Sequence, residues 1–260
     1  MSAATRERLA DLIAAEPFDP AEANLLVSAE ASPGLDVAAA LARVDALAGR
    51  ARGQGVVRAL RAEGLHGDAE DYDDPRNSFL DQVLERGRGL PIALAALTLA
   101  VARRTGTAME GIGLPGHFVV ADMTGPAPEY LDPFDGWAPR SLDELAAIVR
   151  RTSGLEMRAE HLAPAGDRAI LARTLANLRG SYLRRRLLRD ALWTVELGLM
   201  VAPGDPALES QAIGLLAGAG RYDEAERRAN AFLDAHPGHP EAAAVRARLD
   251  AARDMRRRMN

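Results

Sequence analysis

Apolar residues in the first 65 positions recur three or four residues apart. One such stripe is formed by Val37, Leu41 and Val44. This spacing is typical of amphipathic helices that bury one face in a core, and prolines and glycines separate the segments that show it. The pattern predicts four short helices, at residues 5–15, 20–29, 36–48 and 55–63.

A different pattern follows Pro91, where the chain becomes apolar on every side. Residues 92–104 contain no charged side chain before Arg103. A helix that is apolar around its whole circumference is normally the buried centre of its domain, and proline suits the first helical turn. We therefore expect a central buried helix that begins near Pro91 and ends at Gly106.

Beyond Gly106 the pattern changes from helical to strand-like spacing. Three short candidate strands follow, at residues 109–114, 117–122 and 130–131. Residues 141–151 return to helical spacing, and Ser141 is a good N-cap for that helix. Helices, a small sheet on a buried helix and further helices are typical of the α+β class. We predict a mostly helical α+β domain with a small antiparallel sheet at residues 1–160.

An acidic stretch interrupts the helical pattern between His66 and Arg76. We predict a solvated loop there, and a site for a hard cation is the alternative, because such ions bind clustered carboxylates. After the loop, Asn77 or Ser78 is expected to cap a helix that runs to Arg86. The acidic residues of the stretch are Asp68, Glu70, Asp71, Asp73 and Asp74.

The C-terminal part of the chain contains an internal repeat. Pro203 and Pro206 each recur 34 positions later, as Pro237 and Pro240, and this is the period of the tetratricopeptide repeat. We predict an all-α module of such repeats at residues 165–260, and its small size favours docking on the first domain. Its expected helices are residues 169–185, 189–201, 206–218, 222–235 and 240–256.

Composition narrows the chemistry open to this chain. The 260 residues include no cysteine, which excludes disulfides, thiolate metal sites and a cysteine nucleophile. All 32 cationic residues are arginines, the net charge is −5 and aromatic residues make up 4%, so nothing favours direct binding of nucleic acid or an anionic membrane. Residues 1–16 lack the pattern of a secretory signal. We expect a cytoplasmic protein with no cofactor and no metal centre.

Charge is distributed unevenly between the two expected modules. Residues 1–150 carry a net charge of −9 and residues 151–260 a net charge of +4. Arg184, Arg185 and Arg186 form a run of three arginines at the first helical pair of the repeat module, and arginine pairs well with carboxylates. We predict that these arginines bind an acidic protein or peptide partner; the alternative is a solvated helix face.

Four motifs resemble the transglutaminase-like core of the SirB family (the SirB-one type), whose members carry tetratricopeptide repeats after the core. The resemblance implies a fold related to papain-like and transglutaminase enzymes. Arg76, Asn77 and Arg88 lie within the motifs and are candidate binding residues. The motifs are Asp74-Pro-Arg-Asn-Ser-Phe-Leu80, Arg88-Gly-Leu-Pro-Ile92, Gly113-Leu-Pro-Gly-His-Phe-Val119 and Leu131-Asp-Pro-Phe-Asp-Gly136.

The same resemblance implies the positions of a catalytic triad. Enzymes of the wider superfamily place a Cys at the start of the central helix, a His on a neighbouring strand and an Asp on the next. Carried over residue by residue, the His is His117 and the Asp is Asp132, whereas Pro91 stands at the position of the Cys. Proline has no nucleophilic atom. The triad is therefore degenerate, and we expect His117 and Asp132 on adjacent strands, within hydrogen-bond reach.

Two classes of function remain open from the sequence. We expect a non-catalytic, regulatory protein that binds a protein or peptide partner. The rival is a hydrolase or acyl-transfer enzyme that uses His117 and Asp132 with a water or another nucleophile, for which Ser78 and Thr98 are the candidate hydroxyls. A metal site would need a third ligand such as His66, and a purely structural His117 is a further alternative.

Overall fold

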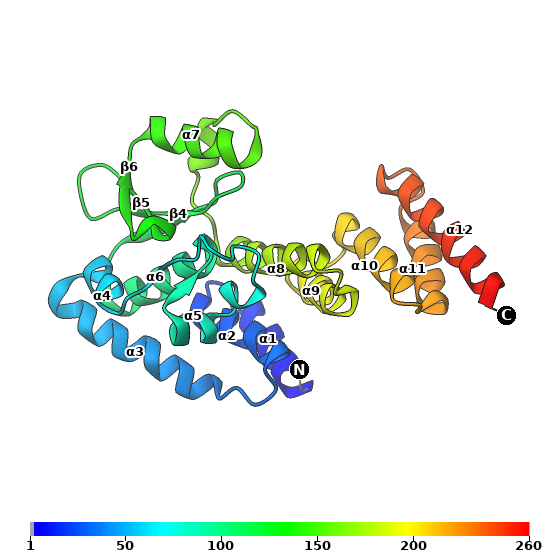
Figure 1. The fold of residues 1–260 in the computed structure, drawn as a ribbon, viewed down its shortest axis with the longest axis horizontal. Helices are drawn as coiled ribbons and strands as arrows, with labels where there is room; N and C mark the ends of the chain where they lie inside the picture. Colours follow the sequence, from blue (N-terminus) through cyan, green and yellow to red (C-terminus); the bar gives the residue numbers. More distant parts are fainter. Residues whose placement is uncertain (1–2, 260) are drawn as a thin grey trace. The chain divides into compact units, whose positions relative to one another are not determined.

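The computed structural model describes residues 3–259, which divide into two compact units. The first unit extends to Thr174 and the second begins at Leu175. Helix α8 (Asp167–Arg184) contains this boundary (Figure 1).

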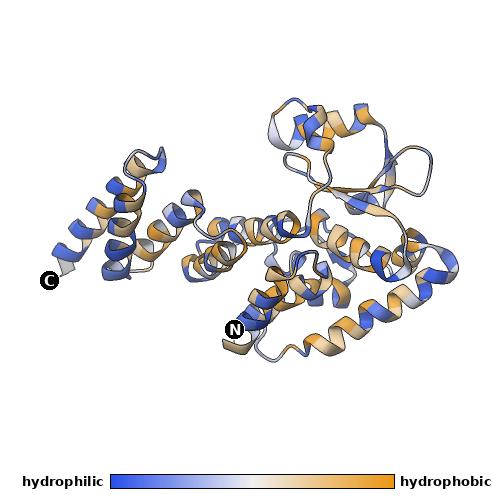
Figure 2. Ribbon diagram, turned by 180° about the vertical axis from the view of Figure 1, so that it is seen from behind, coloured by the Kyte–Doolittle hydropathy of each residue, from blue (hydrophilic) through white to orange (hydrophobic). Residues whose placement is uncertain are grey.

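Seven helices precede α8 in the described part of the first unit, and α6 lies at their centre. Helix α6 contacts α2, α3, α4 and α5 as well as strands β3 and β4 (Figure 1). In Figure 2, α3 alternates between hydrophilic and hydrophobic colours, as expected for a helix with one buried face. The seven helices are α1 (Ala3–Ala14), α2 (Pro20–Ala31), α3 (Val37–Gln54), α4 (Val56–Ala62), α5 (Leu80–Arg86), α6 (Pro91–Thr105) and α7 (Leu142–Ser153).

The buried central helix predicted from the sequence is confirmed. All residues from Pro91 to Ala102 are buried in α6, and Gly106 ends the helix with a positive φ of 72°, a conformation that glycine adopts without strain. Only the last turn, with Arg103 and Arg104, reaches the surface. Burial on all sides fixes the position of the N-terminus of α6 inside the unit.

A small antiparallel sheet packs against α6, in the strand order β3–β4–β5–β6. Its first three strands confirm the predicted segments; β3 and β4 are shorter than predicted, β5 extends one residue further at each end, and β6 was not expected. The predicted strand at 117–122 begins only at Val119, because the N–H of His117 donates to the Leu114 carbonyl in a turn. The strands are β3 (Met109–Ile112), β4 (Val119–Asp122), β5 (Glu129–Asp132) and β6 (Ala138–Arg140).

A buried tryptophan anchors the turn that follows β5. Trp137 is fully buried, and its Nε1–H donates to the Thr98 hydroxyl on α6 at 3.0 Å. The Thr98 hydroxyl in turn donates to the Leu94 carbonyl at 2.7 Å. The backbone of Trp137 has a φ of 58°, which is uncommon for a bulky residue, and Arg61 donates to its carbonyl at 2.9 Å. Hydrogen bonds to Thr98 and to Arg61 therefore hold this turn in place.

The second unit contains only helices among its described residues, and its connections repeat. In the turn from α8 to α9, Leu187 N–H donates to the Tyr182 carbonyl; 34 positions later, Arg221 N–H donates to the Leu216 carbonyl. The positive φ of Arg186, 58°, recurs at Gly220 as 78°. The helices after α8 are α9 (Leu188–Val201), α10 (Pro206–Gly218), α11 (Tyr222–Ala235) and α12 (Glu241–Met259).

None of the helices in the described part of the chain combines the length and apolarity that crossing a bilayer requires.

Candidate functional site

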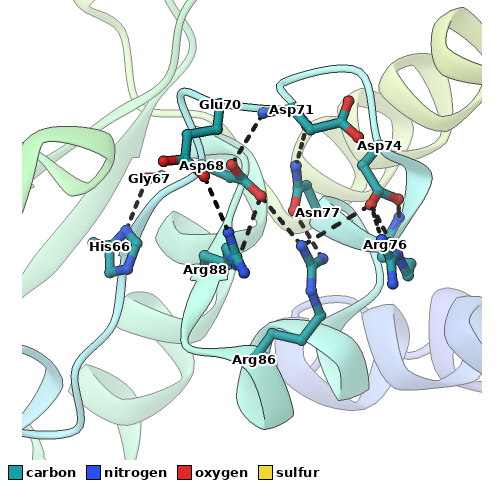
Figure 3. Close-up of polar contacts among 10 residues, drawn as sticks. All are labelled: His66, Gly67, Asp68, Glu70, Asp71, Asp74, Arg76, Asn77, Arg86 and Arg88. Carbon is teal, nitrogen blue, oxygen red and sulfur yellow. Dashed lines mark hydrogen bonds and ion pairs between the residues drawn. The ribbon is translucent and has the colours of Figure 1, made fainter.

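The acidic stretch is a folded, ion-paired loop, so the prediction of a solvated loop is wrong for two of its carboxylates. The side chains of Asp68 and Asp74 are only 1% and 6% exposed. Arginines face both of them, as Figure 3 shows. The remaining acids are less enclosed, and Glu70 is 91% exposed. Burial without a counter-charge would be costly, and the arginines remove that cost.

Arg86, in the last turn of α5, holds the loop together. Its guanidinium donates to the Asn77 amide oxygen at 2.9 Å and to the Asp68 carboxylate at 3.2 Å (Figure 3). The Asn77 amide nitrogen donates in turn to the Asp71 carbonyl at 2.7 Å. Asn77 is fully buried, so the hydrogen bonds of this candidate binding residue serve the loop itself.

Arg76 and Arg88, the other two candidates from the motifs, are more accessible. Arg76 is 61% exposed and pairs with Asp74 at 2.6 Å. Arg88 is 42% exposed and lies 3.9 Å from Asp68 and 3.8 Å from Glu70. Both guanidiniums therefore already face carboxylates of the loop.

The expected helix cap at Asn77 or Ser78 is not formed. Asp74 instead caps the short 3-10 helix η1 (Pro75–Asn77), and α5 begins only at Leu80, with Phe79 as an N-cap that makes no side-chain bond. The amide of Asn77 is already used within the loop, which explains why it does not cap α5. Tertiary contacts here override the local capping preference.

These buried carboxylates predict a loss of stability in acid. Burial acts to raise the pKa of Asp68, but the Asp71 N–H and the Arg88 guanidinium outweigh it and hold that pKa below its ordinary value. A lowered folded-state pKa stabilises the fold above the unfolded value and loses this effect as the pH falls through the folded value. We expect the free energy of unfolding to decrease below about pH 5.

Denaturant unfolding at a series of pH values measures this slope. Asp68→Asn should lower stability at neutral pH and flatten the decrease in acid, because one titrating group is gone. The matched change Glu70→Gln, at a mostly exposed position, should leave the slope nearly unchanged. If the free energy of unfolding of Asp68→Asn decreases in acid as steeply as that of the wild type, Asp68 is not the cause of the decrease.

His117 and Asp132 are hydrogen-bonded, with 2.9 Å between the imidazole Nε2 and the carboxylate Oδ1. Asp132 ends β5, and its Oδ1 also accepts the Phe134 N–H at 3.0 Å at the start of the 3-10 helix η2 (Pro133–Asp135). Because an ionised carboxylate only accepts, Nε2 carries the hydrogen. A neutral ring then presents Nδ1 as an acceptor.

A cleft of about 590 Å³ opens beside this pair. That size is usual for small-molecule and peptide sites. The acidic loop and η2 form one part of its wall, and one face of α7, whose contributing residues are three or four positions apart, forms another. The lining residues are Gly67, Ala69, Tyr72, Gly116, His117, Asp132, Phe134, Asp135, Arg140, Glu144, Ala147, Ile148, Arg151 and Thr152.

The sequence predicted the His117–Asp132 pair that lines the cleft. It did not predict most of the other residues that line it. The α7 wall carries a usable signal, since Glu144, Ile148 and Arg151 repeat at helical spacing. Phe134 also lies within a motif already singled out. Nothing in the local pattern indicates, however, that Tyr72 in the acidic loop would reach the same cleft.

Pro91 occupies the first position of α6, and it is buried. Its neighbours Leu90 and Ile92 are 2% and 1% exposed, and none of the three lines the cleft. The candidate hydroxyls of Ser78 and Thr98 are also buried. The described residues therefore place a His–Asp pair in the cleft and no Ser, Thr or Cys at the start of α6.

The metal alternative finds no support in the geometry. His66 is exposed, and its Nδ1 lies 2.9 Å from the Gly67 carbonyl. Within the part of the chain that the structure describes, no three His, Asp or Glu side chains are grouped as metal ligands.

The basic cluster of the second unit lies at a turn rather than along a helix. Arg184 ends α8, and Arg185 and Arg186 belong to the turn before α9. All three side chains are exposed, as are the flanking Leu183 and Leu187 at 43% each.

Removing Asp132 should destabilise the first unit. Asp132→Ala leaves the His117 ring nitrogen and the Phe134 N–H without their acceptor, and unsatisfied groups of this kind cost roughly 1–3 kcal/mol. Denaturant unfolding of the full chain measures the loss, and Asp135→Ala, at a 65% exposed side chain, is the control. A loss no larger than that of the control would contradict a stabilising role for the pair.

Comparisons with known proteins show the family of the chain. Residues 36–176 match the model of the transglutaminase-like superfamily. A UPF0162 protein of Xylella fastidiosa (strain 9a5c) is 34% identical over 192 residues, which cover 72% of this chain and 68% of that protein. A UPF0162 protein of Pseudomonas aeruginosa is 30% identical over 212 residues, with 74% and 77% covered.

A shorter similarity extends to a human protein. F-box only protein 21 is 36% identical over 69 residues, which cover 26% of this chain and 11% of that protein. No solved structure matches the chain.

Proposed function

We propose a binding function for this chain, which belongs to the transglutaminase-like superfamily and to the UPF0162 family of proteins. In this proposal the cleft beside His117 and Asp132 holds a peptide segment of a partner without forming a covalent bond. The protein then acts as a regulatory binding protein and not as an enzyme.

The observation that carries the proposal is the proline at the start of α6. The resemblance places the nucleophile at Pro91, and no cysteine exists elsewhere in the chain to replace it. A superfamily member of this kind lacks the atom that would form an acyl intermediate. The cleft and the His117–Asp132 bond are nevertheless present, and both are usable for binding.

A substitution that fills the cleft tests this proposal. Ala147 is an exposed cleft residue on α7, so Ala147→Trp should obstruct the cleft without disturbing the core. Asp143→Trp, on the same helix and outside the cleft, is the matched control. On an array of short capped peptides, binding by the full chain should disappear in Ala147→Trp and persist in Asp143→Trp. Equal binding by both variants would overturn the proposal.

Hydrolysis or acyl transfer by an activated water is the second candidate. It is favoured by the tautomer of His117, because Nε2 donates to Asp132 and a neutral ring keeps Nδ1 as a base. Mass spectrometry of the same peptides after incubation separates the two functions. The binding proposal expects unchanged peptide masses with the wild type and with His117→Ala. Products that form only with the wild type would establish the rival.

The second unit is, in this proposal, a tetratricopeptide module of the SirB type that binds an acidic partner. Its support is the 34-residue period of the sequence together with turn hydrogen bonds that recur at the same offset. Arg184, Arg185 and Arg186 supply charge for such a partner at the exposed turn before α9.

Arg186 gives this part of the proposal a measurable signature. Its φ of 58° matches the position where the next repeat has Gly220, and the left-handed conformation costs an arginine about 1–2 kcal/mol. Glycine loses more chain entropy on folding, so Arg186→Gly should stabilise the full chain by about 0.5–1 kcal/mol in denaturant unfolding.

The same variant should bind acidic peptides more weakly and with a smaller dependence on salt. Unchanged affinity for acidic peptides in Arg186→Gly would return the arginine to a solvated surface role.

A further inference from the structure

Some of the charged side chains that line the cleft are paired and others are not. All of its carboxylates have partners: Asp132 bonds to His117, Asp135 pairs with Arg140, and Glu144 accepts from Ser141 and lies 3.8 Å from Arg140. The carboxylates that line the cleft are therefore all paired. Any unpaired charged side chain in the cleft is a cation.

Two arginines, one that lines the cleft and one that contacts the turn carrying His117, have no carboxylate partner in the described part of the chain. Arg151, in the last turn of α7, lines the cleft and is exposed. Arg173, on α8 within the first unit, is half-buried and donates to the Leu114 carbonyl at 3.3 Å. The same carbonyl accepts the His117 N–H at 3.2 Å, which places the Arg173 guanidinium against the turn that carries His117.

The end of α7 that carries Arg151 contacts the same turn. The hydroxyl of Thr152, next to Arg151, shares its hydrogen between the Ile148 carbonyl at 2.9 Å and the Pro115 carbonyl at 3.2 Å. Consecutive carbonyls of the His117 turn are thus held by the end of α7 and by Arg173. Burial lowers the pKa of Arg173, while Tyr72, a cleft residue, acts in the opposite direction. A half-buried cation without a counter-ion is unfavourable, and an anionic ligand would relieve it.

The rest of the cleft restricts the ligand. Between Glu144 and Arg151 the α7 wall is Ala147 and Ile148, and Phe134 also lines the cleft. Seven residues of helix span about 10 Å, which matches about three residues of extended peptide at roughly 3.3 Å each. An apolar side chain of the peptide would pack well against Ala147 and Ile148, in the middle of the α7 wall.

We propose that the end of the cleft lined by Arg151, beside the turn that Arg173 contacts, binds a carboxylate of a short peptide segment whose apolar side chain lies against Ile148. This inference rests on the proposed function, since it names the ligand of the same cleft. The carboxylate comes either from the C-terminus of the peptide or from an Asp or Glu side chain.

Two pairs of capped peptides distinguish these sources. Acetyl-Gly-Leu-Asp-Gly amide and its Asn counterpart test a side-chain carboxylate, and acetyl-Gly-Leu-Gly with a free or an amidated C-terminus tests the terminal one. Each is titrated into the ¹⁵N-labelled full chain, and the amide signals of Gly116, His117 and Thr152 are followed. We expect at least one charged peptide to bind about ten-fold more tightly than its neutral counterpart.

Three variants assign that preference to residues. Arg151→Gln, at an exposed side chain that leaves the core intact, and Arg173→Gln should each abolish it. Arg150→Gln is the matched control, because Arg150 lies in the same turn and pairs instead with Glu156 at 3.1 Å. A preference that survives in Arg151→Gln and Arg173→Gln would overturn the inference.

The outcomes also separate this inference from the proposed function. Equal affinity of charged and neutral peptides at the three amides would refute the carboxylate site and leave peptide binding intact. Absence of any shift at these amides with all four peptides would refute both.

Discussion

Placing a cysteine at position 91 should produce an activated thiol. In Pro91→Cys the thiol would stand at the N-terminus of α6, at the position that the resemblance assigns to the catalytic cysteine, and the resemblance gives it the His117–Asp132 pair as its base. A thiol at a helix N-terminus next to a histidine has a pKa below the ordinary value of about 8.5. Since the thiolate is the reactive form, we expect alkylation by iodoacetamide at neutral pH to be at least about ten-fold faster than for a free cysteine.

The double variant Pro91→Cys with His117→Ala is the control for this result. It keeps the helix terminus and removes the base, so the alkylation rate should fall and its pH dependence should move toward that of an ordinary thiol. Pro91 is buried in the wild type. A thiol that reacts only on unfolding would show that position 91 does not face His117, and that the alignment with the catalytic helix is out of register.

Removing the Trp137 side chain should cost more stability than any other single change considered for the first unit. Trp137 is fully buried, packs in the core around α6 and donates its Nε1–H to Thr98. Truncation of a buried tryptophan to alanine costs about 3–5 kcal/mol. Asp132 and Phe134, which line the cleft, lie just before Trp137 in the chain. Trp137→Ala should therefore also increase the mobility of this part of the cleft lining.

Hydrogen exchange of the amides in α6 measures this effect in the full chain, since it reports opening of the first unit alone. Trp137→Phe is the control, because it keeps most of the apolar volume and loses one hydrogen bond, which contributes about 1 kcal/mol. If protection of α6 in Trp137→Ala stays within about 1 kcal/mol of the wild type, the anchoring role of the tryptophan is wrong.

Elements with a strong local pattern could be predicted from the sequence. The uniform apolarity of residues 92–102 indicated a buried helix because only a central position hides all of its sides. The 34-residue spacing of Pro203 and Pro237 placed the turns of the second unit, where helix bounds differ from expectation by at most three residues. Two-residue strands such as β1 (His66–Gly67) and its parallel partner β2 (Arg88–Gly89) are too short to show any period.

The parts that depend on distant contacts could not be predicted. Asp68 resembles a solvated acid in a run of acids, and its burial follows only from Arg86, which the fold brings alongside it. One face of α7 likewise lines the same cleft as His117 because of how the unit packs, and no local pattern indicates that the two segments come together. His117 and Asp132 were identified through the resemblance, since nothing in the intervening spacing indicates a hydrogen bond.

The ring nitrogens of His117 report directly whether the cleft binds a peptide without reacting with it. Acetyl-Gly-Leu-Asp-Gly amide is titrated into the full chain with ¹⁵N-labelled histidine, and the mass of the peptide is measured in the same sample. We expect a saturable shift of the His117 Nδ1 signal, an Nε2 that stays protonated toward Asp132, and an unchanged peptide mass. A His117 signal that does not respond would show that the cleft does not bind this peptide, and a peptide that is cleaved or joined to another group would show that the protein is an enzyme.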